Sequence, residues 1–271
     1  MPIHPTAIIE GGAAIGDGVS IGPWCRVSSK AALGDGVNLM SNVVIEGRTT
    51  IGARTTVHPF AILGGPPQHL GYRGEDTAIQ IGEDCIIREY STVNLGTVAG
   101  RGQTVIGDKC FLMTGAHVAH DCVVGSNVIF ANNATLGGHV VIGDSVFLGG
   151  LCAVHQFCRI GSYAFIGGCA AVPTDVIPYG SATGNHATLS GLNIIGMKRR
   201  GMSRAAIRDL RAAVRLLFGD EDSFQERVEQ VASAYAQSAE VMRIINFIRE
   251  DTRRPLMAPP RRLWPAGDVL E

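Results

Sequence analysis

The chain has 271 residues, 17% of them charged, and a formal net charge of −1. This balance excludes the strong global field that would drive a protein onto nucleic acid or an anionic membrane surface. No stretch approaches the ~20 apolar residues of a spanning helix, and the repeat described next starts at Ile3, so we expect no signal sequence and a cytoplasmic protein.

An apolar residue recurs every six residues along most of the chain up to residue 172. Glycine often follows it, and the fourth residue after it is usually small. Such a unit forms a short strand and a corner, and three units close a triangular coil of eighteen residues. We therefore predict a mainly β fold, a parallel β-helix over residues 1–190, in which residues eighteen apart stack at about 4.8 Å. The recurring residues are Ile3, Ile9, Ile15, Ile21, Val27, Leu33, Leu39, Ile45, Ile51, Val57, Leu63, Ile81, Ile87, Val93, Ile106, Leu112, Val118, Val124, Phe130, Leu136, Ile142, Leu148, Val154, Ile160, Ile166 and Val172.

Two segments interrupt the period, near residues 64–80 and 95–105. A solenoid accommodates insertions as loops that leave the coil, and binding residues often lie on loops above a rigid scaffold. We expect these loops to border a functional site, with an inert excursion as the alternative.

Six of the seven cysteines occupy the small inward position of their repeats, and no Cys-x-x-Cys pair is present. We interpret them as reduced core residues rather than metal ligands or disulfide partners. They are Cys25, Cys85, Cys110, Cys122, Cys152 and Cys158.

After the β-helix, the apolar residues recur at the spacing of an amphipathic α-helix. Ser203 is a predicted N-cap, the apolar stripe runs from Ile207 to Leu217, and Gly219 follows the helix end. Further helices are predicted at about 223–236 and 238–250. We divide the chain into a β-helix of residues 1–190, a helical domain of residues 191–251 and an irregular tail of residues 252–271.

Four histidines lie close together in the second half of the predicted β-helix: His117, His120, His139 and His155. Under the eighteen-residue rule, Gly138 and Gln156 stack on His120, and His139 stacks on Asp121. One face of three coils therefore gathers these polar side chains, which indicates a site rather than scattered surface histidines.

Three kinds of catalytic site could use this face, and its residues favour one of them over the other two. A zinc site requires converging imidazoles, which the spacing of His117 and His120 signals only weakly, so we expect no metal. A nucleophilic triad lacks a suitable serine or cysteine, because the cysteines point inward. General-base catalysis needs one histidine, an orienting carboxylate and an oxyanion donor, and His120 beside Asp121 meets these needs best.

Four stretches follow one another in the second half of the chain: GAHVAHDCVVGSNVIFANNATLGGHVVIG, GGLCAVHQFCRIGSYAFIGGCAAV, GNHAT and GLNIIGMKRRG. In these stretches and in their order the sequence resembles the UDP-N-acetylglucosamine O-acyltransferases that begin lipid A synthesis. This resemblance implies a homotrimer of left-handed β-helices with active sites between subunits. It also implies transfer of a (3R)-3-hydroxyacyl group from acyl carrier protein to the 3-position of a UDP-sugar, without a cofactor.

The resemblance also implies roles for individual residues. His120 is the general base, Asp121 orients it, and the backbone N–H of Gly138 meets the oxyanion. Basic residues around Lys198 and Arg204 suit either solvent or an acidic carrier protein. The other implied contacts to sugar, nucleotide or pantetheine are His117, His139, His155, Gln156, Asn193, Arg199 and Arg200.

Gly168 stands in column with Gly150 and Asn132, and a residue without a side chain leaves room along a groove. The resemblance makes Gly168 and His186 the acyl-chain ruler, with a longer hydroxyacyl group as the expected donor.

Some positions depart from the family pattern. His69 and Gly71 replace charged residues, Asn94 replaces a histidine, and Ile195 replaces a glutamate. These changes concern the acceptor, so an amide-forming transfer to a 3-amino UDP-sugar is an alternative. A zinc carbonic-anhydrase-like protein and a noncatalytic trimeric scaffold remain less favoured. The N-acyltransferase of the same pathway is disfavoured because it carries a domain ahead of the repeat.

Overall fold

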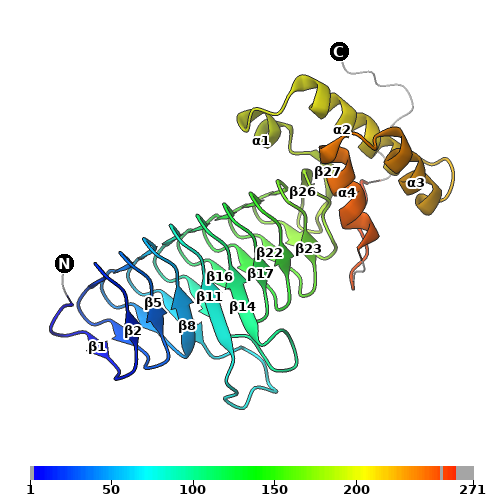
Figure 1. The fold of residues 1–271 in the computed structure, drawn as a ribbon. Helices are drawn as coiled ribbons and strands as arrows, with labels where there is room; N and C mark the ends of the chain where they lie inside the picture. The colour runs from blue at the N-terminus through cyan, green and yellow to red at the C-terminus, as the bar shows by residue number, and fades with distance from the viewer. Residues whose placement is uncertain (1–2, 251–252, 261–271) are drawn as a thin grey trace.

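The computed structural model describes residues 3–250 and 253–260 and shows a long triangular prism with helices beyond one end (Figure 1). Short strands form three sheets, one per side of the prism, and all pairings are parallel except the last hairpin. The first sheet contains β1 (Ile8–Ile9), β4 (Arg26–Val27), β7 (Val44–Ile45), β10 (Ile62–Gly65), β13 (Thr92–Asn94), β16 (His117–Val118), β19 (Thr135–Leu136), β22 (Ala153–Val154) and β25 (Ala171–Val172).

The other two sides follow the same order. The second sheet contains β2 (Ala14–Ile15), β5 (Ala32–Leu33), β8 (Arg48–Ile51), β11 (Ala78–Ile81), β14 (Gln103–Ile106), β17 (Val123–Val124), β20 (Val141–Ile142) and β23 (Arg159–Ile160). The third contains β3 (Ser20–Ile21), β6 (Asn38–Leu39), β9 (Thr56–Val57), β12 (Ile86–Ile87), β15 (Phe111–Leu112), β18 (Ile129–Phe130), β21 (Phe147–Leu148), β24 (Phe165–Ile166), β26 (Gly180–Thr183) and β27 (Thr188–Leu192).

The six-residue period fills the core as predicted. The second residue of most strands points inward and is buried, from Ile21 onward, and the six predicted inward cysteines are buried and unpaired. Ile3 is 47% exposed because no coil lies beneath the first one to cover it. The pairing offset is eighteen residues in uninterrupted coils, thirty where Ile62 pairs with Thr92, and twenty-five where Thr92 pairs with His117. The two loops therefore lengthen individual coils without breaking the stack.

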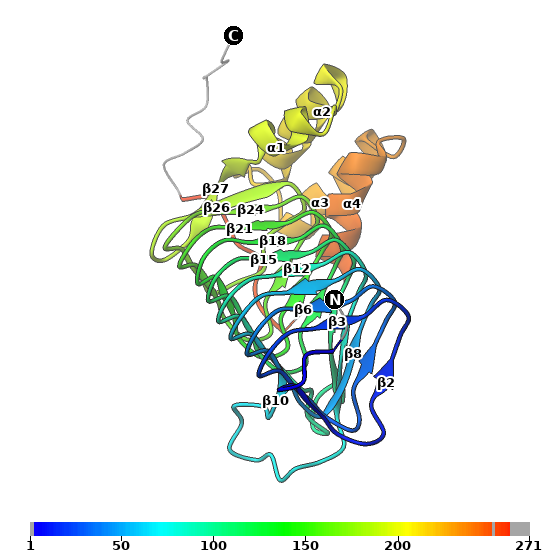
Figure 2. The ribbon, with the colours of Figure 1, turned by 90° about the vertical axis from the view of Figure 1, so that its left-hand side faces the viewer.

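The helices lie beyond the last coil (Figure 2). They are α1 (Ile194–Arg199), α2 (Arg204–Leu217), α3 (Phe224–Ala234) and α4 (Ala239–Arg249), and Ser203, Ser223 and Ser238 cap the last three. The buried stripe of α2 includes Ile207 and Leu217, as its sequence predicts. Among the described residues, no helix has the length and apolar character needed to cross a bilayer.

The junction between prism and helices contains two elements that the periodicity did not predict. The antiparallel hairpin β26–β27 covers the last coil, and the division at residues 190 and 191 falls inside β27. Helix α1 follows directly. The partly buried Arg159 then ties α4 to the prism, because its guanidinium nitrogens lie 2.8 Å from Asp175 Oδ2 and from Glu250 Oε2.

Part of the predicted irregular tail returns to the prism. Leu256 forms an isolated bridge with Asp175, and Met257 is buried. Residues 252 and 261–271 of the predicted tail, and residue 251 at the end of the predicted helical domain, lie outside the described residues.

Candidate active site

Both loops leave the prism at the same corner, which lies between the first and second sheets. One loop joins β10 to β11 and the other joins β13 to β14, and Figure 2 shows the longer one extending away from the prism. We call this edge the histidine corner, defined by residues 119–122, 137–140 and 155–158. His120, Asp121, Gly138, His139 and Gln156 all belong to it, as the eighteen-residue rule predicts.

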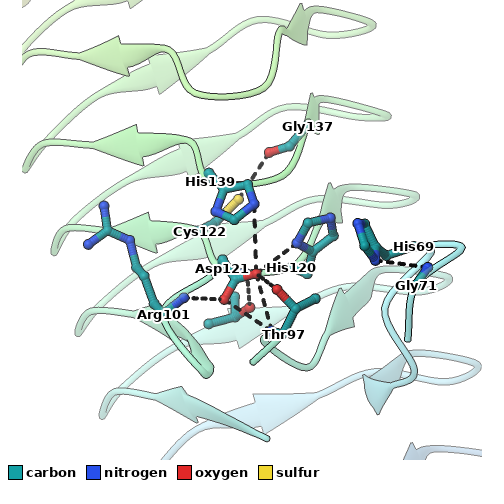
Figure 3. A network of polar contacts seen from close by, with 10 residues as sticks. His69, Gly71, Thr97, Arg101, His120, Asp121, Cys122, Gly137 and His139 are labelled. Atoms are coloured by element: carbon teal, nitrogen blue, oxygen red, sulfur yellow. Dashed lines mark hydrogen bonds and ion pairs between the residues drawn. The ribbon is translucent and has the colours of Figure 1, made fainter. Parts of the chain in front are cut away.

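His120 and Asp121 form the centre of this corner (Figure 3). The Nδ1 atom of His120 lies 2.8 Å from Oδ2 of Asp121. The His120 side chain is 12% exposed and that of Asp121 is fully buried. The imidazole therefore has a fixed orientation and still has access to the surface.

The second loop surrounds the carboxylate of Asp121, which the sequence analysis did not anticipate. The Thr97 hydroxyl donates to Oδ2 at 2.6 Å, and the backbone N–H groups of Thr97 and Arg101 donate to Oδ1 at 3.1 and 2.7 Å. Thr104 Oγ1 accepts from the Asp121 backbone N–H at 2.8 Å. This loop is part of the site rather than an inert excursion.

These contacts keep Asp121 ionised and determine the tautomer of His120. Burial on its own raises the pKa of Asp121, but hydrogen bonds from Thr97, His120 and the backbone of Thr97 and Arg101 lower it below the ordinary value. An ionised Asp121 can only accept, so Nδ1 of neutral His120 carries the proton and Nε2 has the lone pair. His120 is therefore poised to accept a proton through Nε2.

The imidazole lies against bare backbone at Gly138. A Cβ atom placed on Gly138 would lie 2.6 Å from Cε1 and 2.7 Å from Nε2 of His120. The Gly138 N–H has no hydrogen-bond partner among the described residues, so this donor is available beside Nε2. Only glycine fits at position 138, because the imidazole of His120 approaches the backbone too closely to leave room for a Cβ atom.

His139 continues the stack of rings. Its ring centroid is 5.0 Å from that of His120, edge to face, and 4.5 Å from that of Phe157, which is parallel to it. Burial lowers the pKa of His139, and nearby His120, Arg253 and Arg101 lower it further, while Asp121 opposes them. His139 is therefore neutral at pH 7.

The first loop brings His69 to the same place. The His69 and His120 ring centroids lie 5.5 Å apart, and the Gly71 N–H donates to Nδ1 of His69 at 3.1 Å. Nε2 of neutral His69 is therefore the protonated nitrogen and can donate to a ligand. Gly71 contributes through its backbone.

Asn94 is 6% exposed, and its side-chain oxygen has no hydrogen-bond partner among the described residues. Its side-chain nitrogen approaches the Gly65 carbonyl at 3.5 Å. A buried acceptor without a donor costs about 1–3 kcal/mol, so Asn94 can accept from a ligand N–H or O–H.

Three more predicted residues line the first sheet and its edge. His117 Nδ1 lies 2.7 Å from Thr92 Oγ1, and burial lowers the pKa of His117. His155 Nδ1 lies 2.7 Å from an Arg254 nitrogen, and Arg254 Nε donates to the Gln156 carbonyl at 3.1 Å. Arg254 comes from the tail, whose folding back gives no sequence signal.

A single chain does not bring the remaining predicted residues to His120. Asn193 caps α1 through its side-chain oxygen, and Arg199 and Arg200 line a cavity of about 810 Å³ on the third sheet. Gly168 lies at the corner between the third and first sheets, and His186 lies in the β26–β27 turn beside it. The acyl-chain ruler and the nucleotide residues are therefore on other parts of the surface.

His120, Asp121 and His139 offer ligand atoms within 4.8 Å of one another, a spacing that a metal ion can occupy. However, the oxygens of Asp121 already accept from Thr97, Arg101 and His120. A metal would have to displace these donors. The absence of a metal from the mechanism remains a prediction.

Comparisons with known proteins agree with one another. The second domain of the UDP N-acetylglucosamine O-acyltransferases matches residues 175–257, and the bacterial transferase hexapeptide family matches residues 103–138. An acyl-(acyl-carrier-protein)–UDP-N-acetylglucosamine O-acyltransferase from Caulobacter vibrioides is 57% identical and covers 97% of this chain and 100% of its own. One from Bartonella henselae is 51% identical, with coverages of 95% and 94%.

A crystal structure agrees with these sequence matches. The UDP-N-acetylglucosamine O-acyltransferase from Moraxella catarrhalis is 40% identical, covers 95% of this chain and 100% of its own, and has a TM-score of 0.91. The prism is a left-handed parallel β-helix, as the resemblance implied. The chain belongs to the family of acyl-carrier-protein-dependent UDP-N-acetylglucosamine O-acyltransferases.

Proposed function

We propose that this chain transfers a (3R)-3-hydroxyacyl group from acyl carrier protein to the 3-hydroxyl of UDP-N-acetylglucosamine, the first step of lipid A synthesis. The relatives are named for this acyl-carrier-protein-dependent transfer to UDP-N-acetylglucosamine. The observation that carries the proposal is the 2.8 Å contact between His120 Nδ1 and Asp121, which leaves the lone pair on Nε2, beside the bare backbone of Gly138.

The reaction follows from this arrangement. His120 Nε2 takes the proton of the sugar 3-hydroxyl while that oxygen attacks the thioester carbonyl carbon. The carbonyl oxygen becomes an oxyanion and accepts a hydrogen bond from the Gly138 N–H. The carbon–sulfur bond then breaks, and the imidazolium of His120 returns its proton to the leaving thiolate. Asp121 stabilises that imidazolium throughout.

Other predicted residues recognise the acceptor. His69 donates through Nε2, and Asn94 accepts through its unpaired oxygen, so a hydroxyl or acetamido N–H of the sugar satisfies both. His117 on the first sheet and His139, His155 and Gln156 at the histidine corner are assigned to the same substrates.

A homotrimer completes the site. The corner between the third and first sheets exposes Trp24, Phe60, Tyr90 and Leu151, with Phe60 and Tyr90 stacked 5.3 Å apart. Exposed apolar surface of this kind indicates a protein contact. We place the histidine corner of one protomer against the corner between the third and first sheets of the next protomer. Gly168 and His186 lie at or beside that second corner, and they cannot reach His120 of their own chain.

The donor docks on the helical domain. Arg204, Arg208, Arg211 and Arg215 recur along one face of α2 and line a cavity of about 290 Å³ together with Lys198. This face is complementary to an acidic carrier protein. Arg199 and Arg200 stand next to it, at the cavity we assign to the nucleotide of a neighbouring protomer's substrate.

No cofactor is needed, because the thioester supplies an activated acyl group. We place the reaction in the cytoplasm, where acyl carrier protein is found. The comparisons favour this function over a 3-amino acceptor, a carbonic-anhydrase-like zinc site or a noncatalytic scaffold.

The test is an assay of the purified protein with (3R)-3-hydroxyacyl carrier proteins of graded length and UDP-N-acetylglucosamine. Mass spectrometry should show a sugar nucleotide heavier by one hydroxyacyl group, with a longer chain preferred. The absence of that product with every donor would overturn the proposal, and acylation of only a 3-amino analogue would replace its acceptor.

A further inference from the structure

The tail crosses the surface of the β-helix at the coil that contains His155. Its backbone is fixed there by two hydrogen bonds to Asp175. The Pro255 carbonyl accepts from the Asp175 N–H at 2.9 Å, and the Met257 N–H donates to the Asp175 carbonyl at 2.7 Å. These bonds give the neighbouring Arg254 a defined place beside the histidine corner.

The guanidinium of Arg254 binds two groups of this coil at once. Its Nη2 atom lies 2.7 Å from Nδ1 of His155, and its Nε donates to the Gln156 carbonyl at 3.1 Å. A planar guanidinium presents its N–H groups as a rigid fork, so the bond to the carbonyl fixes the direction of the bond to the ring. Arg254 therefore clamps the imidazole of His155 against the backbone of the next residue.

This contact determines which nitrogen of His155 carries the proton. A guanidinium can only donate, so Nδ1 of His155 is the acceptor. The Gln156 carbonyl also lies 3.2 Å from Nδ1, but it already accepts from Arg254, and the 2.7 Å contact is the shorter of the two. Neutral His155 therefore carries its proton on Nε2 and can donate to a ligand, which is the opposite of the arrangement at His120.

Apart from Arg254, the described residues give the His155 ring little support. The ring is exposed, and the residues of its column in the two coils toward His120 are Gly137 and Ala119. An exposed imidazole without a clamp samples several rotamers and both tautomers. The clamp removes this freedom before a ligand arrives, so binding has less side-chain entropy to overcome.

We propose that Arg254 is a positioning residue, which holds His155 as an Nε2–H donor for an oxygen atom of a substrate. This inference rests on the proposed function, from which it takes His155 as a substrate contact. Carbonyl, hydroxyl and phosphate oxygens all accept such a bond. The histidine corner then combines the base His120 with a fixed donor two coils away, at about 10 Å along the prism.

The experiment compares Arg254→Ala and Arg254→Lys with His155→Ala and with the double variant His155→Ala/Arg254→Ala. Arg54→Ala is the matched control, because Arg54 also joins two coils, to Asp84 at 2.7 Å and Glu83 at 2.6 Å, but at the corner between the second and third sheets. Steady-state kinetics gives kcat and both KM values, and nitrogen-15 chemical shifts of labelled histidine give the tautomer of His155. Each variant is checked for unchanged thermal unfolding.

We expect Arg254→Ala to raise the same KM that His155→Ala raises, by roughly three- to tenfold, because the contact is a charge-assisted hydrogen bond at a partly exposed place. The kcat should stay at the wild-type value, since His120 and Asp121 keep their contacts. Lysine should restore part of the loss. In the double variant, Arg254→Ala should add nothing to His155→Ala, because it acts through that ring. The spectra should show Nε2–H in the wild type and both tautomers in Arg254→Ala, and Arg54→Ala should match the wild type throughout.

Other outcomes overturn the inference. Unchanged KM values in Arg254→Ala would show that the contact only anchors the tail. A loss in the double variant equal to the product of the two single losses would show that Arg254 acts independently of His155. Either result would leave transfer by the wild type, and with it the proposed function, intact. A wild type that has the expected tautomer and transfers no acyl group would instead refute the proposed function.

Discussion

Replacing Gly138 with alanine tests whether the position of His120 depends on bare backbone. The added Cβ would lie 2.6 Å from Cε1 of His120, whereas carbon atoms are in contact at about 3.5 Å, so the ring must retreat by about 1 Å. The 2.8 Å bond to Asp121 cannot tolerate that retreat without lengthening or turning. Because Gly138 is not in a left-handed conformation, alanine adds no backbone strain of its own.

A displacement of about 1 Å costs on the order of a hundredfold in rate, so we expect kcat of Gly138→Ala to fall by about that factor. The backbone N–H at position 138 remains, so the decrease in kcat measures the displacement of the base and not the removal of the oxyanion donor. Steady-state kinetics and a crystal structure of the variant provide the measurement. Gly11→Ala is the control, because a Cβ there meets nothing within 4 Å. Wild-type kcat in Gly138→Ala, or an unmoved imidazole, would refute the reasoning.

Three further predictions address the carboxylate, the burial of a histidine and the acyl groove. Thr97→Val removes the hydroxyl that donates to Asp121 at 2.6 Å, and we expect kcat to fall roughly tenfold and Thr97→Ser to restore it; equal rates in all three proteins would contradict this. Burial lowers the pKa of His117 below about 6.5, so the folded state binds fewer protons than the unfolded one as the pH falls through that value. The free energy of unfolding, measured in urea, should therefore decrease from pH 7.5 to pH 5.5, and His117→Gln should flatten this slope; an unchanged slope would count against it. Gly168→Met should shift selectivity toward shorter acyl donors in a competition assay, since a Cβ there already approaches the Gly150 carbonyl at 3.3 Å, and an unaltered preference would remove the ruler.

Periodicity predicted the prism because it reports a local geometric requirement. Each inward branched residue, such as Leu39 or Leu136, must be buried in every coil, so a six-residue repeat appears directly in the sequence. The stacking of His139 on Asp121 follows from the same count, and the His139 N–H bonds to the His120 carbonyl at 3.0 Å. The amphipathic stripe of α2 was predictable for a related reason.

The contacts around Asp121 were not predictable, because they depend on how loops fold back. Thr97 and Arg101 stand twenty-four and twenty residues before Asp121, at offsets that the eighteen-residue rule does not contain. The contacts of Arg254 with His155 and of Arg159 with Phe247 likewise join residues far apart in sequence. The hairpin β26–β27 was missed because it lacks the six-residue period.

The central claim is that His120 is the base of an acyl transfer between protomers. The most direct measurement is the initial rate of hydroxyacyl transfer to UDP-N-acetylglucosamine by His120→Ala, on protein whose mass in solution has been determined by light scattering. The account predicts the mass of a trimer and a rate lower by about 10²–10⁴-fold. A trimeric His120→Ala that transfers at the wild-type rate would contradict it.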